Sequence, residues 1–322
     1  MRITFFADHH TYGQLSNNGG TRTILLSQKE LERQGHIVDV VASVDKYTWH
    51  KHKKPVRSIP KDSQAVIAVS VADIDPMLKK MKKRGIKCRP SVWVRGWPIW
   101  TMSEQSIISK LKRLFTIGGR VYVNASWLHH KLTANGIPSY VVFAGMDDWY
   151  DMQPDNAYCT VGCLYSKRGT KGWKEFEKLH DILGSGYVCE NGTTAELKWV
   201  AFGTEKKGPK WLDKYLSNPS KSELEGLYHK AEYWFSPSAL EGFHNPPAEA
   251  AMCGCLLLCR DIRSGGTQDY ATPETAHLWQ SVEEAAEYIR NPDWSKVLKC
   301  QELIKSTIGT REQAMKKFVE VL

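Results

Sequence analysis

The chain has 322 residues, of which 42% are hydrophobic and 25% charged. These are ordinary values for a globular protein with a real core, and at ~150 residues per domain the length predicts two domains. Lys and Arg outnumber Asp and Glu by 44 to 35, a net charge of +9 with a pI of about 9.0. The excess favours anionic partners, which are phosphorylated ligands, nucleic acid or an anionic membrane surface, and charge alone does not choose among them.

Targeting and membrane segments are not expected. The apolar run in "MRITFFADHH" is too short for a signal peptide, and no run elsewhere reaches the ~20 residues of a membrane span. A cytoplasmic location follows as the default, and the eight cysteines are then expected to be reduced thiols.

In the first part of the chain, short apolar runs alternate with segments of helical period. The expected strands are 2–7, 36–42, 65–70, 91–96 and 120–125, and the expected helices are 21–35, 75–84, 103–116 and 126–136. Because these runs are apolar throughout and alternate with helices, they predict parallel βαβ units and a Rossmann-like layer structure.

The alternation stops at a polar stretch, 144–156, and then starts again. The second set comprises strands 158–165, 186–190, 198–203, 231–238 and 255–259, a helix at 171–183, and helices without strands from about 282. The sequence thus predicts an α/β fold with Rossmann-like domains at 1–148 and 149–305. A C-terminal helix in 306–322 is expected to pack back on the first domain. Parallel sheets bind ligands at the carboxyl ends of their strands, so sites are expected just after strands.

One such stretch is "LEGFHNPPAEAA", which follows the apolar run "YWFSPS". Asn245 is the expected N-cap of a new helix with proline at its first position. The start of that helix would direct free N–H groups and the positive end of its dipole at a phosphate. Glu249 lies one turn inside, and Glu241 lies on the loop. In the other interpretation, Glu241 is solvated and Glu249 only complements the helix dipole. That interpretation leaves Gly242 and the two prolines unexplained.

The segment "FSPSALEGFHNPPAEAAMCGCLLLCRD" resembles the signature of GT-B glycosyltransferases of family 4, which are retaining enzymes with nucleotide-sugar donors. "NNGGTR", "VNASWLHHKLTANGIPSYVVFAGMD" and "VGCLYSKRGTKGW" resemble other segments of the family, in the family's order. The resemblance spans most of the chain. It implies a GT-B fold, with two Rossmann-like domains facing across a cleft, the donor mainly on the second and the acceptor on the first. The compact size is similar to that of virus-encoded members, including chlorovirus ones.

The resemblance also implies roles for individual residues of the second domain. Glu249 would bind the donor ribose and Glu241 the transferred sugar, and the loop between them would add donor contacts from Phe243, His244 and Asn245. Lys171 matches the lysine that neutralises the diphosphate.

The chain departs from the family at the partner of that lysine. Cys163 stands where the family has an arginine, so Lys167 or Arg168 would have to supply the charge. Arg168 is preferred because its planar guanidinium matches a phosphate with two donors.

In the first domain, Gly19 and Gly20 would let backbone N–H groups approach the phosphates, since a Cβ would block that approach; the alternative is a plain turn. Arg95 lies near the position of a family histidine. It could bind the sugar, the acceptor or a structural carboxylate. His9 and His10 follow the first strand and are weaker candidates, because a loop histidine is more often just solvated.

Metal sites are not expected. Asp73-x-Asp75 is similar to the Mn²⁺-binding pattern of GT-A glycosyltransferases, but Asp75 before proline is also a good N-cap. "CGCLLLC" fits no common zinc spacing, which favours buried thiols for its three cysteines, Cys253, Cys255 and Cys259. No cofactor is predicted, because the nucleotide sugar is a substrate.

The predicted function is metal-independent, retaining transfer of a hexose from GDP-mannose or a UDP-hexose to a glycan or other hydroxyl acceptor. A basic nucleic-acid-binding protein and a non-catalytic nucleotide-binding protein are the alternatives. No nucleic-acid-recognition signature is present, so nucleic acid is not expected as a partner. The absence of G-x-G-x-x-G counts against a dinucleotide oxidoreductase. Two interpretations of the basic segment 76–89 stay open: a solvated helix face, and a surface that binds an anionic membrane or acceptor. The sequence also leaves the oligomeric state open.

Overall fold

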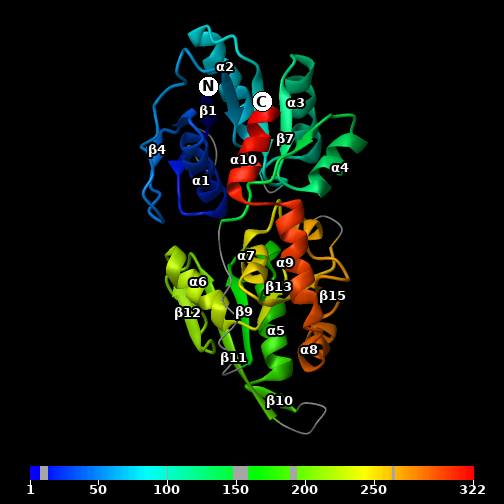
Figure 1. Cartoon of the computed structure of the whole chain (residues 1–322). Coiled ribbons are helices and arrows are strands. Elements are labelled where there is room, and N and C mark those ends of the chain that lie inside the picture. Colours follow the sequence, from blue (N-terminus) through cyan, green and yellow to red (C-terminus); the bar gives the residue numbers. More distant parts are fainter. Residues whose placement is uncertain (8–13, 100, 148–158, 189–193, 263–264) are drawn as a thin grey trace. The chain divides into compact units, whose positions relative to one another are not determined.

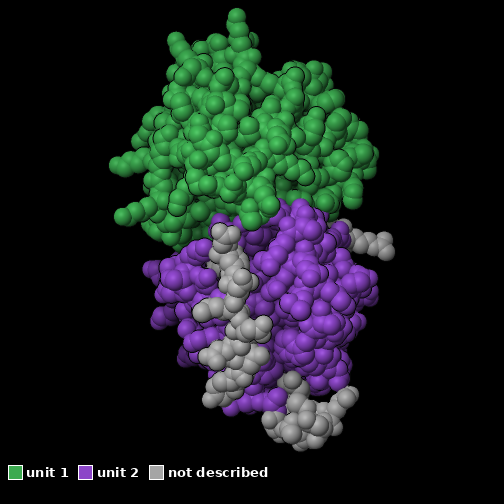
Figure 2. Space-filling view, viewed as in Figure 1, with its two compact units in different colours: residues 1–145, 310–322 green, residues 146–309 purple. Residues whose placement is uncertain are grey.

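A computed structural model describes the chain as two compact units (Figures 1 and 2). Unit 1 comprises residues 1–145 and 310–322, and unit 2 comprises residues 146–309, against predicted boundaries at 148 and 305. The described residues are 1–7, 14–99, 101–147, 159–188, 194–262 and 265–322. Within these ranges, no helix combines the length and the apolar character that crossing a membrane requires.

Unit 1 is built on a six-stranded parallel sheet with the strand order β3-β1-β5-β6-β7-β8. The strands are β1 (Arg2–Phe6), β3 (Ile37–Val41), β5 (Ala65–Ala68), β6 (Pro90–Val94), β7 (Arg120–Val123) and β8 (Tyr140–Val141). A separate two-stranded sheet pairs β2 (Gln14–Leu15) with β4 (Val44–Asp45). The central strands are buried on both faces, as their continuous apolar runs predict.

The helices of unit 1 pack on this sheet. They are α1 (Gly19–Arg33), α2 (Ile74–Arg84) after a short 3-10 turn at Val71–Asp73, α3 (Glu104–Thr116), α4 (Ser126–Ala134) and α10 (Arg311–Glu320). Helix α10, red in Figure 1, belongs to this unit although it comes from the end of the chain. Its Phe318 is fully buried, with ring centroids 5.1 Å from Trp93 and 5.2 Å from Tyr122.

Unit 2 has a seven-stranded sheet in which six strands are parallel, in the order β12-β11-β9-β13-β14-β15. They are β9 (Cys159–Tyr165), β11 (Thr194–Gly203), β12 (Lys214–Ser217), β13 (Tyr233–Ser236), β14 (Leu256–Arg260) and β15 (His277–Trp279). The seventh, β10 (Gly186–Val188), pairs antiparallel with β11.

The helices of unit 2 are α5 (Trp173–Leu183), α6 (Lys221–Lys230), α7 (Asn245–Met252), α8 (Val282–Arg290) and α9 (Ser295–Thr307), with 3-10 turns at Gly169–Lys171 and Gly266–Asp269. Aromatic side chains pack against one another in this unit: the ring centroids of Phe235 and Trp279 lie 4.9 Å apart, and those of Phe176 and Phe235 lie 5.7 Å apart, both pairs stacked. The predicted α/β class with parallel sheets is confirmed.

The order of strands fixes where a site can form in unit 2. From β9 the chain moves outward through β11 and β12, and then returns to the other side of β9 for β13, β14 and β15. The chain therefore continues to opposite sides of the sheet after β9 and after β13, which makes the carboxyl ends of these two strands the topological switch point of unit 2. Ligands of open parallel sheets bind at such a switch point.

Candidate active site

The loops after β9 and β13 are in direct backbone contact. The N–H of Ala239 donates to the carbonyl of Thr170 at 2.9 Å. Gly172 has φ +68°, and a Cβ there would lie 2.5 Å from the carbonyl oxygen of Pro237. A glycine is thus required twice over, by its left-handed backbone and by the close approach of the neighbouring loop.

This contact brings together Lys171 and Glu241, two of the residues singled out in the sequence. The Lys171 ammonium donates to Oε1 of Glu241, and the two side chains are only 19% and 14% exposed. They lie 70 residues apart in the chain, and the switch point between β9 and β13 is what makes them neighbours.

His244 is the third titratable group of this cluster. Its Nδ1 lies 3.2 Å from Oγ of Ser236, and its Nε2 lies 3.5 Å from Oε1 of Glu241. Burial, assisted by the charge of Lys171, lowers the pKa of His244 to about 4 despite the opposing effect of Glu241. The imidazole is therefore neutral at pH 7.

The pKa of Glu241 is set by opposing effects. Burial acts to raise it, whereas the charge of Lys171 and hydrogen bonds from Lys171 and Ser238 lower it, and the net pKa lies below the ordinary value. Glu241 is therefore a carboxylate at neutral pH, held in a partly buried position by a lysine.

Helix α7 begins one residue earlier than predicted. Asn245 is its first residue, and His244, with φ −92° and ψ 93°, is the cap residue, so the assignment of Asn245 as N-cap is wrong. The two prolines that follow have φ fixed near the helical value, which lets the helix begin without a side-chain cap. Prolines also lack N–H groups, so of the first four residues of α7 only Asn245 and Ala248 can offer an N–H group to an anion.

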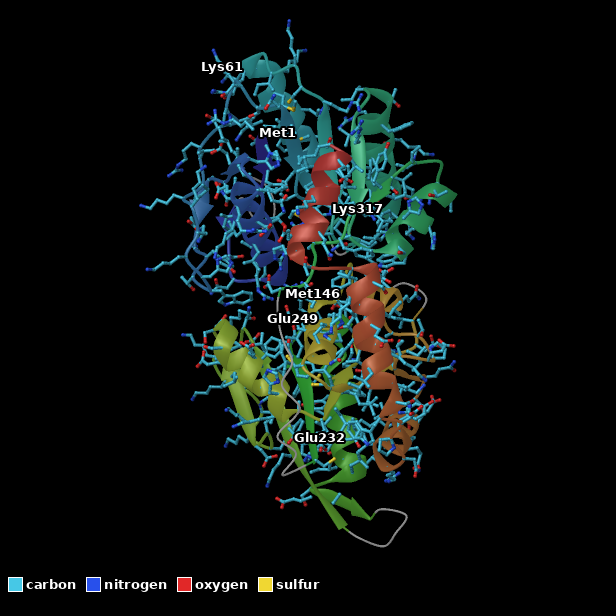
Figure 3. All side chains as sticks on the ribbon, in the orientation of Figure 1. Met1, Lys61, Met146, Glu232, Glu249 and Lys317 are labelled. Carbon is cyan, nitrogen blue, oxygen red and sulfur yellow. The ribbon has the colours of Figure 1, made fainter. Side chains whose placement is uncertain are left out.

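Glu249 lies on α7, which follows β13, and Figure 3 shows it well separated from Glu232, which precedes that strand. Glu249 is 4% exposed, and its Oε2 accepts a hydrogen bond from the Tyr228 hydroxyl at 3.1 Å. Tyr228 therefore fixes the orientation of this carboxylate. Its role as a ribose ligand stays a prediction.

A third loop, after β14, supports the segment between the two glutamates. A Cβ on Gly266 would overlap the carbonyl group of Gly242. The Tyr270 hydroxyl donates to the carbonyl oxygen of His244 at 2.6 Å, and the Tyr270 and Phe243 rings lie 5.5 Å apart. Sequence reasoning did not identify Gly266 or Tyr270, although a Gly-Gly pair just after a predicted strand was an available signal.

The remaining cations differ in what they contact. Lys167 pairs with Glu205 at 3.2 Å, whereas Arg168 is exposed and its guanidinium has no partner among the described residues. Cys163 lies inside β9, fully buried, where burial raises the pKa of its thiol. An arginine at this core position would bury a charge.

The candidates in unit 1 form their own cluster. Gly19 and Gly20 are the first two residues of α1, not a separate turn, and Asn18 caps this helix by accepting from the N–H of Thr21 at 2.8 Å. Arg95 donates to the carbonyl of Val69 at 3.0 Å and to that of Gly20.

Burial lowers the pKa of Arg95 to about 10, with the charge of Asp73 opposing. Through its hydrogen bonds, the Arg95 side chain connects three segments: those that follow β5 and β6, and the start of α1. Its roles toward a sugar or an acceptor stay predictions, and His9 and His10 lie outside the described residues.

The two aspartates of the GT-A-like pattern do not converge. Asp73 is fully buried and accepts from Oγ of Ser70 at 2.6 Å, and Asp75 pairs with Lys110 and Arg113. The predicted N-cap at Asp75 is wrong, because α2 begins at Ile74 and the cap residue is Asp73.

Metal ligands are not grouped elsewhere in the described ranges, which contain no cluster of three or more His, Cys, Asp or Glu side chains suited to a metal ion. Cys253, Cys255 and Cys259 are each 1% exposed and free, as buried thiols should be.

The architecture of the chain is that of the GT-B glycosyltransferases: two Rossmann-like units with parallel sheets. The chain is similar over its whole length to sucrose-phosphate synthase from Thermosynechococcus elongatus (TM-score 0.75, 12% identity, covering 98% of that chain). It is similar to the Anabaena protein HepE in complex with UDP-glucose (TM-score 0.72, 12% identity, 100% of both chains). A third similar structure is an alpha-glucosyltransferase in complex with UDP-glucose and DNA containing an abasic site (TM-score 0.65, 14% identity, 100% of this chain and 98% of that one). No family model and no curated protein matches the sequence.

Proposed function

We propose that the protein is a retaining, metal-independent glycosyltransferase of family 4, which moves a hexose from a nucleotide sugar to a hydroxyl acceptor. The observation that carries the proposal is the Lys171–Glu241 pair at the switch point of the unit 2 sheet, beside the first turn of α7. A parallel sheet binds ligands at this point, and a cation and a carboxylate placed there suit the two ends of a sugar diphosphate.

Transfer requires the anomeric C–O bond to break while negative charge builds on the diphosphate. Lys171, the exposed guanidinium of Arg168 and the positive end of the α7 dipole would stabilise that charge. Lys171 carries three N–H donors, so it can keep Glu241 and still bind a phosphate oxygen. Glu241 would accept hydrogen bonds from hydroxyls of the transferred sugar.

Glu249 is the proposed ribose ligand. Because Tyr228 already orients its carboxylate, binding would cost little conformational entropy. Phe243, His244 and Asn245 complete the donor loop, with Gly266 and Tyr270 as its support. Gly19, Gly20 and Arg95 are proposed as the contribution of unit 1.

UDP-glucose is the first donor to test. Two similar structures, HepE and the alpha-glucosyltransferase, are complexes with this sugar nucleotide. GDP-mannose follows, because the sequence resemblance to family 4 allows either base.

Isothermal titration calorimetry with UDP-glucose, UDP and GDP-mannose, each with and without EDTA, tests the proposal. We expect one nucleotide sugar to bind, with affinity unchanged by EDTA. Lys171→Met should weaken binding at least tenfold through the lost diphosphate contact, and Lys178→Met, which changes the same residue type farther along α5, should not. The absence of binding to all three ligands would refute the proposal.

A second set of variants tests the carboxylates. Glu249→Ala should weaken the binding of UDP and UDP-glucose alike. Glu241→Gln should weaken UDP-glucose more than UDP, because Glu241 would contact the sugar. Glu287→Ala, an exposed carboxylate on α8, is the control. The anomeric configuration of the product, measured by NMR, tests retention separately.

Nucleic acid is the second candidate partner, and one observation favours it: a similar alpha-glucosyltransferase was solved with DNA. Here DNA would be the acceptor. Transfer of labelled glucose to DNA, measured beside transfer to oligosaccharides, decides between the two acceptor classes.

A further inference from the structure

The two units carry opposite net charges. Unit 1 contains 26 Lys and Arg against 11 Asp and Glu, a charge of +15, whereas unit 2 contains 18 against 24, a charge of −6. The two values add to the +9 of the whole chain. The positive excess that favours an anionic partner is therefore located entirely in unit 1.

Six of the 26 Lys and Arg side chains of unit 1 are exposed together at one edge of its sheet. The strands are parallel, so the residues that enter β5, β6 and β7 lie at the same edge, which is the amino edge. We name six exposed cations there the basic edge: Lys61 before β5, Lys82 and Lys83 in the last turn of α2, Lys87 and Arg89 before β6, and Lys112 near the end of α3. Figure 3 labels Lys61 at this end of unit 1.

The basic edge is not neutralised by the protein. None of its six cations forms an ion pair with a described residue. The nearby carboxylate of Asp62 is paired with Arg2 at 2.5 Å, and residues 76–103 contain no Asp or Glu. The apolar side chains of Met77 and Met81 on α2 are buried in the core, so they do not cover the basic edge.

Exposed apolar side chains share this edge. Met1 and Ile37, at the amino ends of β1 and β3, are 40% and 53% exposed. Phe115 and Ile117, in the segment that leads from α3 into β7, are 44% and 53% exposed. At about 4.8 Å between neighbouring strands, the distance from β3 to β7 is about 19 Å. The edge is thus a surface of mixed basic and apolar character.

We infer that the basic edge, with Phe115 and Ile117, docks unit 1 on an anionic lipid bilayer. Clustered Lys and Arg are attracted to anionic headgroups, and apolar side chains among them insert into the interface. Nucleic acid fits this edge less well, because Phe115 is the one ring among the four exposed apolar side chains named here, and Met and Ile give bases no stacking surface. The edge also lies at the opposite end of the strands from the carboxyl ends, where substrates of parallel sheets bind.

Co-sedimentation with vesicles tests the inference. The full chain is mixed with phosphatidylcholine vesicles, or with vesicles of phosphatidylcholine and phosphatidylglycerol at about three to one, a composition chosen to give an anionic surface. We expect binding to the anionic vesicles only, weakened by high salt. The variant Lys82→Glu/Lys83→Glu/Lys87→Glu/Arg89→Glu should lower the partition coefficient by about tenfold or more. Phe115→Ser/Ile117→Ser should lower it without changing the charge.

The matched control replaces four exposed lysines of unit 2 with glutamate: Lys206, Lys207, Lys210 and Lys214. This variant should bind vesicles nearly as well as the parent. Equal loss of binding in this control, or no binding to anionic vesicles, would overturn the inference. Retention of a DNA duplex through the basic edge, without vesicle binding, would assign the surface to nucleic acid instead. UDP-glucose titration of the same variants separates this result from the proposed function, because none of the substituted residues belongs to the proposed donor site.

Discussion

Replacing Lys171 with methionine tests the central pair of the site. The variant keeps the length of the side chain and removes the cation that faces Glu241, whose carboxylate is only 14% exposed. His244 is not expected to replace the charge, because burial is the largest cause of its lowered pKa and the substitution leaves that burial in place. Breaking a fully buried pair costs about 3–5 kcal/mol; with both side chains slightly solvated, we expect the free energy of unfolding at pH 7 to fall by about 2–3 kcal/mol.

The pH dependence of this loss has a definite sign. With Lys171 present, the pKa of Glu241 is lowered, so the pair stabilises the fold above the unfolded pKa of the carboxyl and this contribution is lost as the pH falls. Without Lys171, burial is left to raise the pKa of Glu241, and the cost of a buried carboxylate then grows as the pH rises. The difference between variant and parent should therefore be larger at pH 7 than at pH 5.

Urea unfolding followed by tryptophan fluorescence at both pH values measures the effect. Lys178→Met is the control, because its partner Glu283 is 61% exposed and the pair is screened by water. Lys171→Met/Glu241→Gln should recover much of the loss, since the amide carries no charge to desolvate. A double variant no more stable than Lys171→Met would refute the reasoning, as would a Lys171→Met protein as stable as the parent at pH 7.

Three further predictions concern the loops of the site. Gly172→Ala should lower the free energy of unfolding by about 1–3 kcal/mol, because the φ of Gly172 is +68° and an added Cβ would meet the facing loop. Gly169→Ala is the control, because a Cβ there would lie in open space. Equal losses of stability in the two variants would contradict the argument. Gly266→Ala should displace the Gly242 carbonyl and weaken nucleotide-sugar binding in calorimetry, and unchanged affinity would remove the supporting role of this loop. His244→Gln should flatten the pH dependence of the free energy of unfolding between pH 6.5 and 4. Because the pKa of His244 is lowered in the folded protein, the contribution of the neutral imidazole to stability is complete above about pH 6.5 and is lost as the pH falls toward 4. An unchanged pH profile of urea unfolding would contradict a buried, neutral His244.

Several elements were accessible from the sequence because their physical cause is local. The run "RITFF" is apolar throughout, so it forms a strand wherever both faces of a sheet are covered, and β1 spans Arg2–Phe6. Helix α2 ends at Arg84 because Gly85, with φ +67°, takes the left-handed conformation that stops it.

Weaker local signals were missed or displaced. Strand β15 has only three residues, which is too short a run to show periodicity in the sequence. Strand β10 pairs antiparallel with β11, and the direction of pairing depends on the partner strand. The cap of α7 moved from Asn245 to His244, since two prolines set the helix start more firmly than a capping side chain does.

The α/β class, the positions of the main strands and the residue types of the candidate site could be predicted from the sequence, because hydrophobic period, turn residues and charge are local properties. Three relations come from the fold: Lys171 faces Glu241, His244 is buried and neutral beside them, and Gly266 supports their loop. Those relations depend on the strand order, which places β13 beside β9 across about 70 residues of chain. Contacts over such a distance are set by how the sheet assembles, and no spacing in the sequence records them.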